Sequence, residues 1–285
     1  MKSFILAARP KTLPAALVPV WVGVVLANHI EGEWSVSLAF FTLMGALWIQ
    51  IATNFFNDAI DSDKGADTVN RIGPVRATAS GKLSRKTVYL SACSCLLLAA
   101  TFSVPLIVER GWIMILIGLP SFYFSYGYTG GVLPLAYKGL GELFVILFFG
   151  LVAVSGTVFV QTGEWYTEAW MTGLAIGCLS AVLISINNLR DAVEDKSNGK
   201  NTLAVQWGRE KALLLLYLMN ATAYACLPLV FPGSVGLLYF LPAALLGVFI
   251  LYSVKVNSAG PIYNKYLALA AIQLVMYASA YTLVA

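Results

Sequence analysis

The chain has 285 residues, of which 59% are hydrophobic and only 11% are charged. An ordinary soluble domain carries about 25% charged residues, so this chain has too few to cover a soluble globule of its size. The composition therefore excludes a cytosolic enzyme, a disordered chain and a nucleic-acid-binding domain. It predicts a protein that crosses a membrane several times.

Nine apolar runs follow one another, each close to the length of about 20 residues that a membrane helix needs. They cover roughly residues 13–30, 35–56, 88–108, 112–128, 139–160, 171–188, 212–230, 234–254 and 265–284. We therefore predict an all-α integral membrane protein with nine transmembrane helices. The remaining residues are too few for a separate soluble domain, so residues 1–285 are expected to form a single domain.

The basic residues predict the orientation of these helices. With the N-terminus in the cytoplasm, 17 of the 18 Lys and Arg residues fall on the cytoplasmic side, and only Arg110 lies outside. Such a bias is typical of cytoplasmic loops, and nine spans then place the C-terminus outside. The net charge of +4 is explained by this topology and by contact with anionic lipid. Two cytoplasmic loops are long, 57–87 and 189–211.

All six aspartates of the chain lie in these two loops. They are Asp58, Asp61, Asp63 and Asp67 in the first loop and Asp191 and Asp195 in the second. Clustered carboxylates suit oxygen-preferring cations such as Mg²⁺, and 11 of the 18 basic residues share the same loops. Since Lys and Arg bind phosphate by charge-assisted hydrogen bonds, the mixture predicts a Mg²⁺ site for a phosphate-bearing ligand.

Helical spacing aligns these acids with polar residues inside the spans. One stripe on the second helix contains Gln50, Asn54, Asn57, Asp58 and Asp61. A second stripe on the sixth helix contains Asn187 or Asn188, Asp191 and Asp195. Polar residues within a span usually face a bundle interior or a cavity, so we expect both stripes to meet in one cavity at the cytoplasmic end.

Basic and aromatic residues complete the candidate site. Arg71, Arg76 and Lys82 follow the first aspartate cluster, Lys200 follows the second, and Tyr123, Tyr126 and Lys138 flank the loop after the fourth span. The two tyrosines either wall a cation or belong to an interfacial aromatic belt. Two further arginines have alternative interpretations: Arg9 is a topology anchor or a ligand contact, and Arg190 is a ligand contact or a local ion-pair partner of Asp191.

The chain resembles the UbiA superfamily of intramembrane aromatic prenyltransferases from residue 8 to about residue 208. The matching segments are ARPKTLPAALVPVWVG (8–23), NFFNDAIDSDKGADT (54–68), RIGPVRATASGKLS (71–84), YKGLGELFVILFFG (137–150) and NNLRDAVEDKSNGKNTLAV (187–205). GADT, RIGPVR and NNLRD are most similar to its menaquinone branch. Gly65 stands where many members have the third acid of the first motif, so either Asp63 or Asp67 takes that place; the spacing of Asp67 resembles the menaquinone branch.

The resemblance implies nine helices around a cavity that opens toward the lipid, in a bacterial plasma membrane with the site facing the cytoplasm. It implies a polyprenyl diphosphate donor, 1,4-dihydroxy-2-naphthoate as acceptor, and demethylmenaquinone as product with loss of carboxylate and diphosphate. Asp58, Asp61, Asp191 and Asp195 would be catalytic and, with Asp67, would hold Mg²⁺. The substrate-binding residues would be Asn54, Asn57, Arg71, Lys82, Tyr123, Tyr126, Lys138, Asn188 and Lys200.

Other functions remain compatible with these residues. The acceptor is alternatively 4-hydroxybenzoate, homogentisate, a chlorophyllide or haem, because all of these use the same donor chemistry. A cation-coupled transporter also carries intramembrane acids, but its sites lie near the midplane. A non-catalytic lipid-binding membrane protein has no need of two aspartate motifs. The sequence leaves open the general base, for which Asp195 is one candidate, the prenyl chain length and the oligomeric state.

Overall fold

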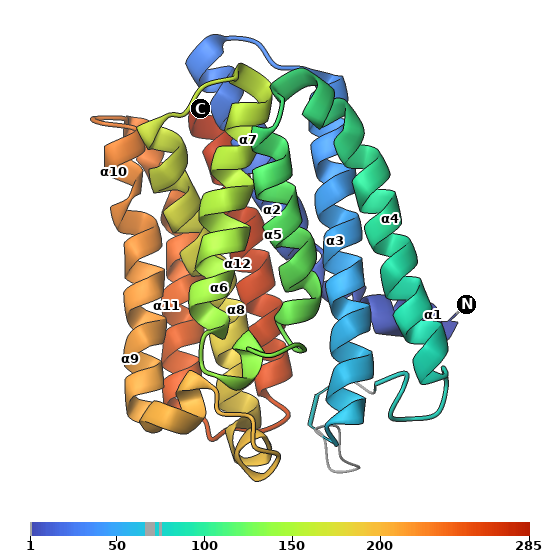
Figure 1. Cartoon of the computed structure of the whole chain (residues 1–285). Coiled ribbons are helices and arrows are strands. Elements are labelled where there is room, and N and C mark those ends of the chain that lie inside the picture. Colours follow the sequence, from blue (N-terminus) through green and yellow to red (C-terminus); the bar gives the residue numbers. More distant parts are fainter. Residues whose placement is uncertain (1, 66–71, 74–75) are drawn as a thin grey trace.

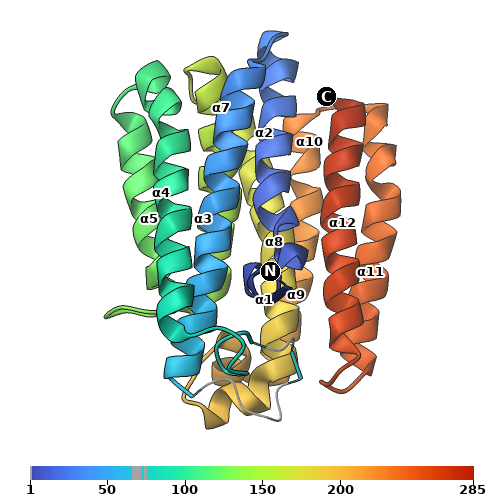
Figure 2. The same ribbon diagram turned by 90° about the vertical axis from the view of Figure 1, so that its right-hand side faces the viewer.

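The structure, a computed structural model, describes residues 2–65, 72–73 and 76–285. Long helices lie side by side in a bundle, and α1 (Lys2–Ala8) lies crosswise beside α3 (Figures 1 and 2). The other helices are α2 (Pro14–Glu31), α3 (Val36–Asp63), α4 (Arg85–Arg110), α5 (Ile113–Gly127), α6 (Gly141–Val145), α7 (Ala153–Thr162), α8 (Thr167–Ser197), α9 (Leu203–Ala225), α10 (Leu227–Val230), α11 (Leu241–Val256) and α12 (Tyr263–Val284). A π-helical stretch, Ile146–Val152, joins α6 to α7.

The bundle has the lengths and surfaces of a membrane protein. Within the described ranges, eight helical segments are long and apolar enough to cross a bilayer, and α5 is a shorter apolar helix of 15 residues. At 1.5 Å per residue such a helix is about 23 Å long, less than the ~30 Å hydrocarbon core. The outer faces expose large apolar side chains such as Leu97, Val108 and Leu119. The prediction of an all-α multi-span protein is thus confirmed, with eight candidate spans among the described residues.

The helices that carry the aspartates extend beyond the apolar runs. α3 continues to Asp63, α8 continues to Ser197, and α9 begins at Leu203. The segments 57–87 and 189–211 are therefore helical in part, and the aspartates lie on helices as the two polar stripes predicted. Hydropathy marks where apolar side chains stop, whereas the backbone hydrogen bonds of a helix continue for two further turns.

α8 lies in the centre of the bundle and contacts α2, α6, α7, α9, α10 and α12. Its closest approach is to the π-helical stretch, where three glycines let the two backbones meet. A Cβ atom built on Gly150 would lie 2.3 Å from the Gly173 carbonyl oxygen and 2.5 Å from Gly177 Cα. These contacts are with backbone, so no side chain can move aside to make room. This crossing brings α6 against the half of α8 that carries Ser185 and Asn188.

We expect Gly150→Ala to lower the midpoint of thermal unfolding in detergent, because the added methyl separates α8 from the π-helical stretch at a cost of about 1–3 kcal/mol. The matched control is Gly118→Ala, since a Cβ at Gly118 meets nothing within 4 Å. Alanine favours a helix over glycine by about 0.5–1 kcal/mol, so the control should be neutral or slightly stabilising. Equal midpoints for the two variants would contradict the packing described here.

Candidate functional site

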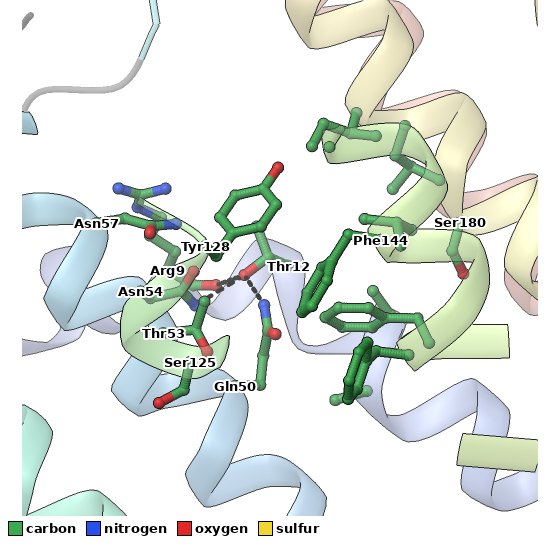
Figure 3. A pocket seen from close by; sticks show the side chains of 18 of the residues that line it. Arg9, Thr12, Gln50, Thr53, Asn54, Asn57, Ser125, Tyr128, Phe144 and Ser180 are labelled. Carbon is green, nitrogen blue, oxygen red and sulfur yellow. Dashed lines mark hydrogen bonds between the residues drawn. The ribbon is translucent and has the colours of Figure 1, made fainter. Parts of the chain in front are cut away.

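One cavity of about 1080 Å³ runs through the bundle between α2, α3, α5, α6, α7, α8 and α12. Its lining is polar at the end where α3 and α8 finish and becomes apolar along α5, the π-helical stretch and α7. Figure 3 shows the polar side chains of α3, among them Gln50 and Asn54, on one side of this pocket and Phe144 on the other. The cavity therefore offers a charged end and an apolar channel to the same ligand.

The first aspartate cluster is buried at the end of α3. Asp58 accepts hydrogen bonds from the backbone N–H groups of Ala77 (2.9 Å) and Thr78 (2.8 Å). Asp61 accepts one from the Tyr137 hydroxyl (2.9 Å) and one from Arg76 Nη2 (2.9 Å). Both carboxylates line the cavity, and each one also fastens a connecting segment onto α3.

The second cluster lies on α8, as the helical spacing predicted. Asp191 forms a two-point ion pair with Arg190, with Nε to Oδ1 at 2.7 Å and Nη2 to Oδ2 at 2.6 Å. Asp195 lies 3.5 Å from Lys200 Nζ. Its other oxygen, Oδ2, is buried and has no hydrogen-bond partner among the described residues. Asp195 and Asp61 interact electrostatically, so the α3 and α8 clusters belong to one site.

Arg190 does more than pair with its neighbour in sequence. Its side chain is buried and also donates from Nη1 to Asn264 Oδ1 on α12 (2.6 Å) and from Nη2 to Asn187 Oδ1 (2.8 Å). The interpretation of a local ion pair is correct but incomplete, because the sequence gives no signal for the contact with residue 264. Arg190 holds the carboxylate of Asp191 in place and ties α8 to α12.

The polar stripe on α3 is also used to hold the N-terminal segment. Asn54 Nδ2 donates to the Ala8 carbonyl oxygen (2.8 Å) and to Thr12 Oγ1 (3.0 Å), and Gln50 Nε2 donates to the same hydroxyl (3.4 Å). Thr12 lies beside these groups in Figure 3, where Arg9 projects near Asn57. Asn57 accepts a hydrogen bond from the Thr129 hydroxyl. The stripe is thus both cavity lining and structural anchor.

The structure brings together most, but not all, of the residues predicted for the site. The predicted residues that line the cavity are Asn54, Asn57, Asp58, Asp61, Asn188, Asp191, Asp195 and Lys200. Four others, Lys82, Tyr123, Tyr126 and Lys138, are exposed and lie outside the lining. Asp67 and Arg71 lie outside the described residues.

Asp63 points away from the cavity. Its carboxylate pairs with Arg85 (2.9 Å) and accepts a hydrogen bond from the Tyr89 hydroxyl (3.2 Å) on α4. Of the two aspartates considered for the third acid of the first motif, Asp63 is therefore engaged elsewhere in this structure.

Several residues of the site were missed by the sequence analysis. Lys64 Nζ lies 3.7 Å above the centre of the Tyr137 ring and donates to the Thr129 carbonyl oxygen (2.7 Å). Tyr128 lines the cavity beside Glu142, and a phenol hydroxyl can donate a hydrogen bond there. Tyr137 begins the segment YKG. Nothing in the sequence of this segment indicates that the tyrosine contacts Asp61, which lies far upstream.

The donor set fits a hard divalent cation. Carboxylates and several amide oxygens face one cavity; the acidic residues in its lining are Asp58, Asp61, Glu142, Asp191, Glu194 and Asp195. Hard cations prefer such oxygen ligands. The buried Asp195 Oδ2, which lacks a hydrogen-bond partner, points to an interaction with a positively charged ligand. Within the part of the chain that the structure describes, three or more acidic, His or Cys side chains are not gathered closely enough to form a ready metal cage. The present partners of the carboxylates are instead Arg76, Arg190 and Lys200.

Comparison with known proteins identifies the family. The model of the UbiA prenyltransferase family matches residues 16–261, which is most of the chain. The chain belongs to this family. The predicted resemblance is thereby confirmed, and so is the conclusion that the protein is a prenyltransferase. The transporter and the non-catalytic lipid-binding protein are no longer needed as explanations.

Curated relatives are 33–37% identical to this chain over the aligned residues. The 1,4-dihydroxy-2-naphthoate octaprenyltransferase of Bacillus subtilis is 37% identical over 76% of this chain and 69% of its own length. That of Escherichia coli is also 37% identical, over 72% of this chain and 68% of its own length. That of Haemophilus influenzae is 33% identical over 77% of this chain and 73% of its own.

Solved structures support the fold. The apo UbiA homolog from Aeropyrum pernix superposes with a TM-score of 0.74 at 15% identity, covering 95% of this chain and 97% of that one. The UbiA homolog from Archaeoglobus fulgidus bound to GPP and Mg²⁺ has a TM-score of 0.68 at 16% identity, covering 98% of this chain and 99% of that one. At these identities the likeness establishes a UbiA-like fold.

We expect Arg190→Met to destabilise the protein by about 3–5 kcal/mol, because it leaves the Asp191 carboxylate buried without its counter-charge. The matched control is Arg85→Met, which removes an exposed guanidinium from its pair with Asp63 and should cost about 0–1 kcal/mol. The stability of both variants is measured by thermal unfolding in detergent, with the loss of monodisperse protein as the signal. Equal unfolding midpoints would show that Arg190 does not hold α8 and α12 together.

Proposed function

We propose that this protein transfers a polyprenyl group from polyprenyl diphosphate to 1,4-dihydroxy-2-naphthoate with decarboxylation in menaquinone biosynthesis. The direct product is the hydroquinone form of demethylmenaquinone, which becomes demethylmenaquinone on separate oxidation. The observation that carries the proposal is the meeting of four aspartates from α3 and α8 at the polar end of a long apolar cavity. The choice of acceptor rests on the 33–37% identity with three 1,4-dihydroxy-2-naphthoate octaprenyltransferases.

The proposal includes a topology. The chain is a single prenyltransferase domain of residues 1–285 with nine spans, α5 being the shortest of them. The N-terminus and the aspartate end face the cytoplasm of a bacterial plasma membrane, and the C-terminus lies outside. Support comes from the 17 of 18 basic residues on one side and from the position of the C-terminus at the end of the bundle opposite the ends of α3 and α8 (Figures 1 and 2).

The proposed cofactor is Mg²⁺, held by Asp58, Asp61, Asp191 and Asp195, with Asp67 as a further candidate. Support comes from the buried carboxylates described above and from the related structure that contains Mg²⁺ with GPP. When bound, Mg²⁺ neutralises the negative charge that develops on the leaving diphosphate.

Basic side chains of the protein would hold the diphosphate. Arg76, Arg190 and Lys200 already lie against the carboxylates of the site, and charge-assisted hydrogen bonds from them would bind the phosphate oxygens. Lys64 is a further candidate because its ammonium group lies over the Tyr137 ring. Arg71, Lys82 and Lys138 remain predicted contacts that require the connecting segments to approach the site.

The apolar part of the cavity would keep water from the reacting carbons. An allylic cation is rapidly captured by water, so a channel lined by side chains such as Phe144, Phe148 and Val152 protects it. Phe144 and Phe148 are stacked with their ring centres 4.5 Å apart, and aromatic faces attract positive charge. The remainder of the channel would hold the prenyl tail.

We expect Asp61→Asn and Asp191→Asn each to reduce prenyl transfer by at least about 100-fold, since each removes one positioned charge from the leaving-group site. The matched control is Asp63→Asn, whose carboxylate pairs with Arg85 outside the cavity and whose loss should leave transfer near the wild-type rate. The assay uses purified membranes, labelled polyprenyl diphosphate, and 1,4-dihydroxy-2-naphthoate and 4-hydroxybenzoate in parallel, with and without Mg²⁺.

The outcomes separate the possible functions. A decarboxylated prenyl naphthoquinone formed only with Mg²⁺ supports the proposal. Product from 4-hydroxybenzoate alone would keep the chemistry and change the acceptor. Wild-type turnover in Asp61→Asn, or an inactive Asp63→Asn protein that is folded, would contradict the arrangement of the site.

A further inference from the structure

A buried carboxylate other than those of the four aspartates faces the cavity and has no part in the donor chemistry above. Glu142 lies in the first turn of α6, lines the cavity and is only 4% exposed. It comes from a helix other than the two that carry the aspartates. In the sequence Glu142 stands beside an apolar run and apart from the aspartate motifs, so the sequence pattern does not mark it as a site residue.

The two oxygens of Glu142 have different environments. Oε1 accepts hydrogen bonds from Asn188 Nδ2 (2.9 Å) and Ser185 Oγ (3.4 Å), both on α8. Oε2 is buried and has no hydrogen-bond partner among the described residues. One oxygen therefore fixes the side chain, and the other is left to accept a proton or a hydrogen bond from a ligand in the cavity.

The surroundings of Glu142 suit a flat aromatic ligand. Phe144 follows on the same helix, stacks on Phe148 and lies 5.4 Å from the Tyr128 ring and 5.3 Å from that of Phe124. Phe144 and Phe148 line the cavity beside Tyr128. A bicyclic ring held against these faces would share the cavity with the polar groups of Glu142 and Tyr128.

A purely structural role explains only half of this arrangement. A tie between α6 and α8 needs a single acceptor for Asn188, and the amide oxygen of glutamine would serve as well. An ionised carboxylate in an apolar bundle is expensive unless it is fully paired. The charged group that acts on it from a neighbouring element is Lys200, which stabilises the negative charge. The Tyr128 hydroxyl lies in the same cavity, and the contacts of Glu142 on α8, Ser185 and Asn188, are neutral.

We infer that Glu142 is the general base that accepts the hydroxyl proton of the aromatic acceptor as its ring attacks the prenyl donor. This inference rests on the proposed function and assigns it a catalytic residue. A base must lie within hydrogen-bond reach of the proton that it removes, and Glu142 Oε2 is the oxygen that the structure leaves for that contact.

The step balances without any further reactant. The ring carbon that bears the carboxylate forms a bond to the allylic carbon, and the bond from that carbon to the diphosphate oxygen breaks, with its electron pair leaving on diphosphate. The neighbouring hydroxyl becomes a carbonyl as its proton passes to Glu142. The product of this step is a β-keto carboxylate. Its carbon–carboxylate bond then breaks to release CO₂, the electron pair restores the aromatic ring, and the oxygen takes its proton back from Glu142.

The test compares Glu142→Gln with Glu142→Asp. Glutamine keeps an acceptor for Asn188 but removes the base, so transfer at neutral pH should fall by about 10²–10⁴-fold. The loss should shrink as the pH rises, because the acceptor hydroxyl then ionises without help. Aspartate retains a carboxylate one methylene shorter, so Glu142→Asp should recover a large part of the rate. Unfolding midpoints in detergent are recorded for each variant.

The results distinguish the inference from the proposed function. A wild-type protein that forms no product from the naphthoate contradicts the proposed function. A wild-type rate in Glu142→Gln, or a loss that stays constant with pH while Glu142→Asp is no better than Glu142→Gln, overturns the assignment of Glu142 alone. If Glu142→Gln fails to fold, the comparison of Glu142→Asp with wild type decides, since a general base predicts a reduced rate with unchanged affinity for the prenyl donor.

Discussion

The central constraint on this protein is the burial of charge inside an apolar bundle. Asp58, Asp61, Asp191, Asp195 and Glu142 are all buried, and a buried carboxylate is tolerated only when it is paired and hydrogen-bonded. Four of the five find partners that hold distant parts of the chain against α3 or α8. Asp195 instead has a long contact with Lys200. The same charges that would serve chemistry therefore also organise the end of the bundle where α3 and α8 finish.

This pairing prepares the site for a charged ligand. Arg76, Arg190 and Lys200 neutralise carboxylates in this structure. A divalent cation bound with a diphosphate would be held by the carboxylates, and the three basic side chains would then be available to the phosphate oxygens. In such an arrangement each buried charge would keep a partner of opposite sign, which limits the cost of desolvating the diphosphate in an apolar cavity.

The sequence predicted the parts of the site that depend on local periodicity. The spacing of Asp58 and Asp61, and of Asp191 and Asp195, places each pair on one helical face, and α3 and α8 continue far enough to carry them. Contacts between distant residues could not be read in this way. Tyr137 reaches Asp61 because Leu135–Tyr137 forms a short turn beneath α3.

Two exposed lysines show that proximity in sequence does not establish membership of the site. Lys82 and Lys138 are close to the aspartate motifs in sequence and have suitable charge, yet their side chains are exposed outside the cavity lining. Glu142 shows the opposite case. It is isolated from the aspartate motifs in an apolar segment of the sequence, yet in the fold it contacts Asn188 on α8. That meeting depends on Gly150, Gly173 and Gly177, whose missing side chains allow α8 to touch the π-helical stretch. A π-helical insertion also rotates the residues on either side of it relative to an unbroken α-helix. The close packing at these three glycines thus sets the position of α6 against α8 and, under the inference above, whether the Glu142 carboxylate can reach the acceptor.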